Sequence, residues 1–248
     1  MPIRFLAAML LAAVSLAFTL PASAEMTPAQ RAEVEEILRG YLLKNPEVIL
    51  EALEVLEARN QAAQEDRQQA TLALHREELE RDAASPVLGN PRGDVTIVEF
   101  FDYQCGYCKQ ASVSLRELLE KDSGVRLVMK EFPILGPASL IGARAALAAK
   151  RQEGYEELHW ALMAHRGQLS EESILSLAAE VGLDVKRLRA DMEDPAIQEK
   201  LRANYRLAEA LQIRGTPAFV IGDQLLPGAV PLEHLEAAVA TVRSRAQR

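Results

Sequence analysis

The stretch FFDYQCGYCKQ, residues 100–110, contains the only two cysteines of the 248-residue chain. Two thiols three positions apart can form a redox couple, half of a metal site or a structural disulfide. A bridge between Cys105 and Cys108 would close almost no loop, and the stabilisation that a disulfide provides grows with the loop it closes. A purely structural role is therefore disfavoured.

The residues around the pair predict a βαβ unit. VTIVEFF, residues 95–101, is apolar enough for a strand buried on both faces, the segment 109–122 has helical periodicity, and VRLVMKEF, residues 125–132, predicts a second strand. Such a unit places the two strands parallel and adjacent. Cys105 then lies in the first turn of the helix, where free N–H groups and the helix dipole favour its thiolate. Cys108, one turn later, can resolve a mixed disulfide formed on Cys105.

The rest of the C-terminal part completes an α/β fold. Residues 137–212 are predicted as a block of about four helices, after which AFVIG (218–222) and QLLPG (224–228) predict two paired strands and residues 232–246 a final helix. A helical block is thus inserted between two β-containing halves. The turn-rich SPVLGNPRGD, residues 85–94, separates this part from the preceding helices.

The N-terminus predicts export. Arg4, a short apolar run and a small-x-small site ending at Ala24 predict a signal peptide over residues 1–24, with an uncleaved anchor as the alternative. No second apolar run of spanning length follows, so we expect a soluble protein in a disulfide-permissive compartment. The formal net charge of −8 disfavours binding to nucleic acids or anionic membranes.

Residues 25–84 predict a helical arm and linker. Thr27 and Gln30 form a capping-box pattern, a new helix start follows at Asn45, and both helices carry apolar residues at helical spacing. This apolar stripe needs a partner, either the body of the same chain or the same segment of another chain. Apolar residues recur every seven positions from Ile49 to Ala70, which favours self-association through residues 27–60.

Metal binding has little support in the sequence. Zinc requires further sulfur or imidazole ligands, and the four histidines show no ligand spacing with the cysteines. Copper(I) held by Cys105 and Cys108 alone is conceivable as a side activity. No other cofactor is expected besides the redox-active cysteine pair.

The arrangement of strand, CxxC, helix and strand resembles the thioredoxin superfamily, and the helical insertion is similar to its DsbA branch. RGTPAFVIG, residues 214–222, strengthens the resemblance, because a proline at this place is cis in the family. The resemblance implies that Thr216-Pro217 is a cis bond, that the backbone of Thr216 pairs with substrate, and that Gly106 and Tyr107 adjoin it. An ordinary trans turn proline is the alternative.

Glu99 is a carboxylate in the middle of an apolar strand, where burial is costly without a partner or a role. In the family this position resembles the buried acid that relays a proton to the resolving cysteine. Lys130, near the end of the next strand, is predicted as its charge partner. The alternative is an edge residue that faces water.

Gly106 and Tyr107 place no histidine between the cysteines, which predicts a milder oxidant. Gly-Tyr at this place and Thr216 before the proline look like isomerases of the DsbC type. The combination of these traits with a DsbA-like insertion resembles the suppressor-of-copper-sensitivity protein C group. Residues 34–57 are similar to the N-terminal region of that group. The resemblance implies a periplasmic disulfide isomerase or reductase that acts on cysteine-containing clients. It also implies a membrane thiol reductase as electron donor and a homo-oligomer, with a trimer favoured. A monomeric dithiol oxidase and a copper-binding or chaperone-like protein remain alternatives.

The predicted fold is α/β, a thioredoxin fold with an inserted helical domain, preceded by a helical oligomerisation arm. Its predicted parts are a signal peptide (1–24), the arm and linker (25–84) and a catalytic domain (85–248) made of thioredoxin parts (93–136 and 213–248) and the insertion (137–212).

Overall fold

The computed structural model describes residues 26–247, so the predicted signal peptide lies outside the described residues. Contacts divide the chain into two compact units, with the break between Asn60 and Gln61. Each unit is described by itself. Within the described range, no helix combines the length and the hydropathy that a membrane crossing requires.

The N-terminal unit contains α1 (Pro28–Lys44) and the first part of α2 (Glu47–Leu74). The predicted capping box is present, with the Thr27 hydroxyl accepting from the Gln30 backbone and the Gln30 side chain accepting from the Thr27 backbone. Asn45 caps the C-terminus of α1, and the helical pattern restarts after it as predicted. No residue of α1 is buried. The exposed large apolar side chains of this unit are Met26, Val34, Ile37, Leu38, Tyr41, Leu43, Ile49, Leu50, Leu53, Val55 and Leu56.

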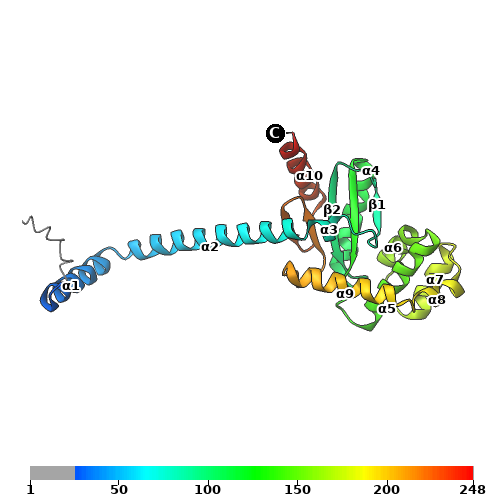
Figure 1. Ribbon diagram of the computed structural model, residues 1–248, viewed down its shortest axis with the longest axis horizontal. Coiled ribbons are helices and arrows are strands. Elements are labelled where there is room, and N and C mark those ends of the chain that lie inside the picture. Colours follow the sequence, from blue (N-terminus) through cyan, green and yellow to red (C-terminus); the bar gives the residue numbers. More distant parts are fainter. Residues whose placement is uncertain (1–25, 248) are drawn as a thin grey trace, which may run out of the picture. The chain divides into compact units, whose positions relative to one another are not determined.

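A five-stranded sheet forms the centre of the second unit (Figure 1). Its strands are β1 (Val87–Gly89), β2 (Val95–Phe101), β3 (Val125–Glu131), β4 (Ala218–Ile221) and β5 (Gln224–Pro227), in the order β1-β3-β2-β4-β5. The predicted parallel pairing of β2 with β3 is confirmed, and the other neighbours are antiparallel. β1 lies in the segment predicted as a turn-rich break. It is too short to show a periodic pattern.

Helices cover both faces of this sheet. α4 (Gly106–Lys121) and α10 (Leu232–Ala246) pack on one face, and α3 (Arg76–Glu80) and the end of α9 (Pro195–Ala210) pack on the other. The insertion consists of α5 (Pro137–Ala149), a short 3-10 turn (Lys150–Gln152), α6 (Tyr155–Ala164), α7 (Glu171–Glu180), α8 (Val185–Asp191) and α9. It therefore contains five α-helices where about four were predicted, because α8 is a two-turn helix.

The boundary between the two units differs from the predicted one at residue 84. Leu72 of α2 and Leu79 of α3 are buried in the same apolar cluster as Val98 and Phe100 of β2. These two leucines stand in an otherwise polar helical sequence that the apolar pattern assigns to an exposed linker. Their burial places residues 61–84 with the sheet.

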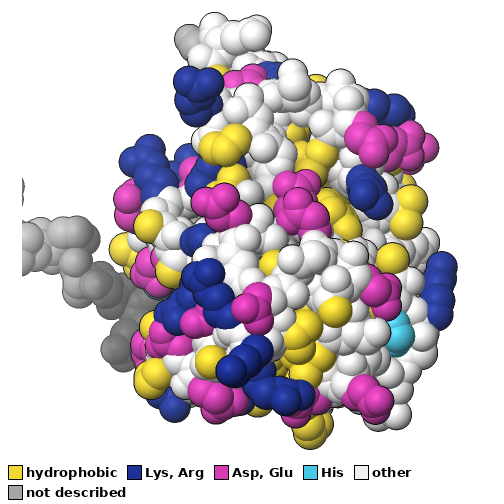
Figure 2. Space-filling view, turned by 90° about the vertical axis from the view of Figure 1, so that its right-hand side faces the viewer, with side chains coloured by type: hydrophobic (Ala, Val, Ile, Leu, Met, Phe, Trp, Pro, Cys, Tyr) yellow, Lys and Arg dark blue, Asp and Glu magenta, His cyan; other side chains and the backbone are white. Residues whose placement is uncertain are grey.

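The surface carries mixed charge. On the face drawn in Figure 2, hydrophobic side chains lie in small groups between acidic and basic ones. Such interspersion is typical of a solvated protein surface.

Candidate active site

The two cysteines lie where β2 leads into α4. Cys105 is the N-cap residue of α4 with an extended backbone (φ −74°, ψ 115°), and Cys108 lies one turn into the helix. Both are free thiols. Cys108 has no exposed surface, whereas Tyr107 between them is 68% exposed. The predicted order, one thiol at the helix terminus and one behind it, is the order that the structure has.

Asp102 holds the turn that carries Cys105. Its buried carboxylate accepts hydrogen bonds from the backbone N–H groups of Gln104 (2.7 Å), Ile134 (2.8 Å) and Leu135 (2.9 Å). The Cys105 N–H donates to the Asp102 carbonyl oxygen at 3.0 Å. A carboxylate with three N–H donors is well satisfied. Asp102 thus fixes the loop before α4, a role that the sequence analysis did not anticipate.

The two thiols have opposite proton affinities. A hydrogen bond from the Cys108 thiol, helped by the backbone N–H groups of Tyr107 and Cys108, lowers the pKa of Cys105 to about 5 against the opposing effect of partial burial. Burial raises the pKa of Cys108, and the hydrogen bond to Cys105 and the charge of Glu99 raise it further. At neutral pH the first thiol is therefore a thiolate and the second a thiol.

The loop before β4 lies against the reactive sulfur. The Thr216–Pro217 peptide bond is cis, as predicted. The Cys105 thiol donates to the Thr216 carbonyl oxygen at 3.2 Å. When Cys105 ionises, the Thr216 carbonyl oxygen loses this thiol donor. It is then free to accept a hydrogen bond from the backbone N–H of another chain. The Pro217 carbonyl oxygen accepts from Gly228 N–H at 2.8 Å, which ties the loop to the end of β5.

Glu99 is buried beneath the cysteines. It is 1% exposed, so the alternative of an edge residue facing water is wrong, and one of its carboxyl oxygens has no hydrogen-bond partner among the described residues. Burial raises the pKa of Glu99 to about 8, and the charge of Cys105 adds to the shift. A carboxyl with this pKa exchanges its proton near neutral pH.

Lys130 is not the partner of Glu99, which corrects the prediction. In the register of β2 and β3, Lys130 is opposite Phe100 and Glu99 is opposite Met129, so the two side chains project from opposite faces of the sheet. The Lys130 ammonium donates to the carbonyl oxygen of Glu78 (2.6 Å) and to the hydroxyl of Ser85 (2.8 Å). It joins α3 and the segment after it to the sheet.

A second buried acid lies on the same face as Glu99. Glu131, at the end of β3, accepts hydrogen bonds from the hydroxyls of Tyr103 (3.1 Å) and Tyr155 (2.8 Å) through one carboxyl oxygen. The Tyr103 hydroxyl also lies 3.0 Å from Nδ1 of the buried His159. Burial raises the pKa of Glu131 and lowers that of His159 to about 3, so His159 is neutral at pH 7.

Sequence reasoning missed this network. Its one visible signal was Lys130-Glu131, two adjacent charged residues at the end of a strand otherwise predicted as buried. Adjacent strand residues face opposite sides, so one of the two had to lie on the side of Glu99. The residue on that side is Glu131, and the prediction of Lys130 was wrong.

Among residues 26–247 no group of three or more His, Cys, Asp or Glu side chains is arranged to hold a metal ion. The chemistry that the arrangement supports is thiol-disulfide exchange, since it places a thiolate beside a buried second thiol and a proton-exchanging acid.

The fold and the site together define a thioredoxin-fold domain with a redox-active cysteine pair. Residues 96–240, more than half of the chain, match the family described as DSBA-like thioredoxin domain. The chain therefore belongs to the DsbA-like thioredoxin family of thiol-disulfide oxidoreductases. Residues 30–63 match the copper resistance protein ScsC N-terminal domain, so the chain joins a DsbA-like domain to an ScsC-type helical region.

Solved structures show the same likeness. A thioredoxin-like oxidoreductase from Silicibacter pomeroyi is 48% identical, with 68% of this chain and 98% of that chain covered and a TM-score of 0.67. ScsC of Proteus mirabilis in a transitional conformation is 31% identical, with 90% and 100% of the two chains covered and a TM-score of 0.66. The second likeness extends over the N-terminal helical region as well as the DsbA-like domain.

Curated relatives include much longer proteins. The Na(+)/H(+) antiporter NhaA 1 of Salinispora arenicola is 32% identical over 157 residues, which cover 62% of this chain and 24% of that protein. The chain spans about a quarter of the length of this relative. The match shows a related domain within the longer protein.

Proposed function

We propose that the protein is an exported thiol-disulfide oxidoreductase that isomerises or reduces non-native disulfides in client proteins. The observation that carries the proposal is the contrast between the two thiols. Cys105 has a pKa of about 5, whereas burial raises the pKa of Cys108. A thiol that is ionised at neutral pH can attack a disulfide and is also a good leaving group, and both properties are needed to shuffle bridges.

The exchange proceeds in two steps. The Cys105 thiolate attacks one sulfur of a client disulfide, so that an S–S bond forms between Cys105 and the client and the second client sulfur leaves as a thiolate. The mixed disulfide can then be attacked by another client thiolate, which completes an isomerisation and regenerates Cys105. Alternatively Cys108 loses its proton and attacks Cys105, which releases a reduced client and leaves the Cys105–Cys108 disulfide.

Glu99 is the acid that we assign to the second step. Its ionised form accepts the proton of Cys108, since the carboxyl lies on the buried side of the pair and has a free oxygen. Regeneration of the dithiol then requires a donor of electrons, for which a membrane thiol reductase is the proposed partner. Residues 1–24, predicted as a signal peptide, support a periplasmic location.

The isomerase role over an oxidase role rests on two features. Gly106 and Tyr107 place no cation or imidazole beside Cys105, which disfavours an extreme oxidant. Most large apolar side chains of α1 and of the first part of α2 are exposed in the single chain. Exposed apolar stripes of this extent favour association with another copy, and an oligomer presents several Cys105 thiolates to one client. We propose a homo-oligomer, with a trimer favoured, through residues 27–60.

Refolding of a scrambled multi-disulfide enzyme tests the function. The reduced protein in catalytic amounts should restore activity to the scrambled substrate, and Cys105→Ala should not. A protein that only oxidises reduced substrate is a dithiol oxidase. One that binds copper(I) or unfolded client without changing any disulfide is a binding protein, and either result would replace the proposed function.

Light scattering of the mature chain tests the oligomer. Ile37→Glu together with Leu53→Glu should reduce the mass to that of one chain, because charges would be buried in the association surface. Gln69→Glu, which adds a charge of the same kind at an exposed polar position of α2 outside residues 27–60, is the control. A single-chain mass for the unmodified protein contradicts the proposal.

A further inference from the structure

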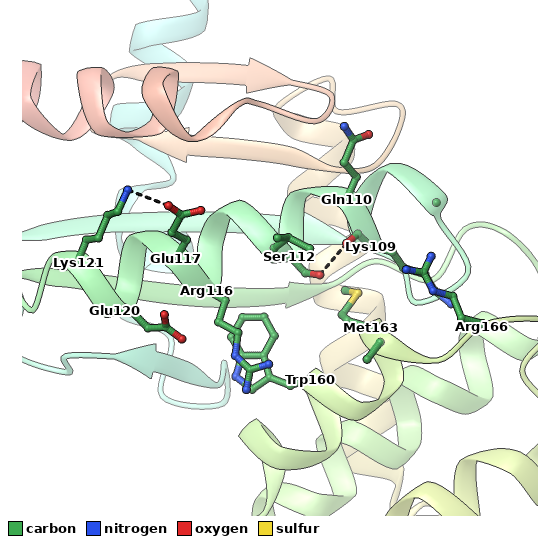
Figure 3. Close-up of a pocket in the computed structure, with 13 residues that line it drawn as sticks. Lys109, Gln110, Ser112, Arg116, Glu117, Glu120, Lys121, Trp160, Met163 and Arg166 are labelled. Atoms are coloured by element: carbon green, nitrogen blue, oxygen red, sulfur yellow. Dashed lines mark hydrogen bonds and ion pairs between the residues drawn. The ribbon is translucent and has the colours of Figure 1, made fainter.

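A groove along α4 begins beside the reactive cysteine. It has a volume of about 960 Å³ and lies between α4 and α6. Gly106 lines its near end, next to Cys105, and Trp160 and Met163 of α6 line its wall (Figure 3). A Cβ added at Gly106 would meet no atom within 4 Å, so this end of the groove is open. A chain attached to Cys105 has room to enter it.

Three cations other than Lys121 line the groove. They are Lys109, Arg116 and Arg166. Lys109 is held at the rim because its ammonium donates to the His165 carbonyl oxygen at 2.6 Å. The Arg116 guanidinium carbon lies 5.4 Å from the centre of the Trp160 ring, against which Figure 3 shows it. These contacts fix two of the three positive charges without neutralising them.

None of the three cations is paired with a carboxylate in the described part of the chain. Burial lowers the pKa of Lys109, and the nearby positive charge of Arg166 lowers it further. Lys121 at the far end differs, since it pairs with Glu117 at 2.8 Å and with Glu236 at 3.7 Å. The lining also includes Glu120, so its four cations outnumber its two carboxylates by two and the groove is basic.

The groove on the other side of α4 has the opposite character. Its charged lining consists of Glu117, Glu233, Glu236 and the paired Lys121. The helix that carries the cysteines thus separates a basic groove from an acidic one, in a chain whose formal net charge is −8. A client segment with negative charge is attracted to one side and repelled from the other.

We propose that the basic groove binds an acidic segment of the client protein while the client's cysteine is joined to Cys105. This proposal rests on the proposed function and adds the client's chemistry to it. Carboxylates of the client pair with Arg116 and Arg166, whose guanidinium groups suit them. Apolar client side chains contact Trp160 and Met163. The groove selects clients by charge and fixes the direction in which the client chain leaves Cys105.

Exchange rates with two peptide disulfides test the proposal. Each peptide carries one cysteine in a mixed disulfide with the same neutral small thiol, and the peptides differ only in having Glu or Gln around the cysteine. The reduced full-length protein should react about three- to tenfold faster with the Glu peptide, which corresponds to two partly exposed charge pairs. Added salt should remove the difference.

Variants of the groove sharpen the test. Arg116→Gln with Arg166→Gln should slow the Glu peptide to the rate of the Gln peptide and leave the Gln peptide unchanged. Lys186→Ala removes an exposed cation of α8 that does not line the groove, and it should change neither rate. Thermal melting checks that each variant is folded.

Three results overturn the proposal. Equal exchange rates for the two peptides would show that the groove does not distinguish clients by charge. An equal loss of rate for both peptides in the arginine variant would show the same. If an oligonucleotide binds the groove and the Glu peptide reacts no faster than the Gln peptide, the basic surface is a nucleic-acid site. Failure of the unmodified protein to react with either peptide would instead contradict the proposed function.

Discussion

The two faces of the central sheet treat buried charge differently. On the face toward α4, Glu99 and Glu131 each leave one carboxyl oxygen without a hydrogen-bond partner among the described residues. On the opposite face Lys130 is as deeply buried, but its ammonium donates to the carbonyl oxygen of Glu78 and to the hydroxyl of Ser85. Buried polar groups are normally satisfied. Among the buried charged side chains of β2 and β3, the two exceptions lie on the face that carries the cysteines.

The difference in hydrogen bonding distinguishes a buried charged group with a structural role from one with a functional role. Lys130 stabilises the junction between the sheet and the segment after α3, where complete hydrogen bonding is an advantage. Glu99 sits beneath a thiol that must lose its proton, and a carboxyl with a free oxygen can accept it. Neighbouring strands of one sheet can thus carry buried charges with unrelated roles.

The largest expected effect is at the first cysteine. Cys105→Ala should abolish thiol-disulfide exchange, because no other described thiol is ionised at neutral pH. Cys108→Ala should retain attack and accumulate the mixed disulfide, which non-reducing electrophoresis detects. Exchange at the wild-type rate by the Cys105 variant would show that the face toward α4 is not the reactive one.

The second prediction uses the opposite pH dependence of Glu99 and Lys130. The pKa of Glu99 is raised to about 8 from 4.5, so the folded state keeps a proton that the unfolded state releases, and stability falls as pH rises between these values. The pKa of Lys130 is lowered to about 7 from 10.5, so stability from this group falls as pH decreases from 10.5 to 7. Glu99→Gln should flatten the first slope and Lys130→Met the second, and the change in stability over each pH range is at most about 5 kcal/mol.

Urea unfolding at acidic, neutral and alkaline pH measures these slopes, and exchange kinetics separate the two roles. Glu99→Gln should slow release of the mixed disulfide by Cys108, whereas Lys130→Met should leave that rate unchanged. A slowing by the lysine variant alone would reverse the assignment of the two faces.

A smaller effect is expected in the network around Glu131. Tyr155→Phe removes one of two hydroxyl donors to a buried carboxyl and should cost about 1–3 kcal/mol in the free energy of unfolding. Tyr103→Phe removes the other donor two residues before Cys105, at similar cost. We expect the pH profile of exchange to move only with Tyr103, which lies nearer to the thiols. If both variants show the same pH profile of exchange, the network has only a structural role.

The smallest effect is expected at the exposed residue between the cysteines. Tyr107 is 68% exposed, so Tyr107→Ala should change stability by no more than about 0.5 kcal/mol. Tyr107→His should instead make the couple more oxidising, since an imidazole near Cys105 stabilises its thiolate. Equilibration with glutathione measures this potential, and a value unchanged by the histidine would contradict the account of the intervening residues.

Local patterns in the sequence predicted much of the fold and the site. The βαβ unit, the placement of Cys105 at a helix terminus and the cis bond before Pro217 follow from residues close together in the chain. The partner of Glu99 depended on the strand register, which decides the face on which a side chain lies. Lys130 and Glu131 differ by one position, and that one position separates the two faces.

Interactions between distant segments could not be predicted in the same way. Tyr103, Glu131 and His159 come from a loop, a strand and an inserted helix, and no spacing in the sequence links them. The burial of Leu72 and Leu79 depends on the sheet that covers them, so the polar residues around them predicted an exposed linker. Long-range packing decided both cases.

The ionisation of Cys105 tests the central claim most directly. Thiolate absorbance of the reduced protein, or its rate of alkylation, is followed against pH. The account predicts a midpoint near pH 5 for one thiol, with an upward shift of that midpoint in Cys108→Ala because the donor from Cys108 is lost. A single midpoint near that of an ordinary cysteine, about 8.5, would contradict it.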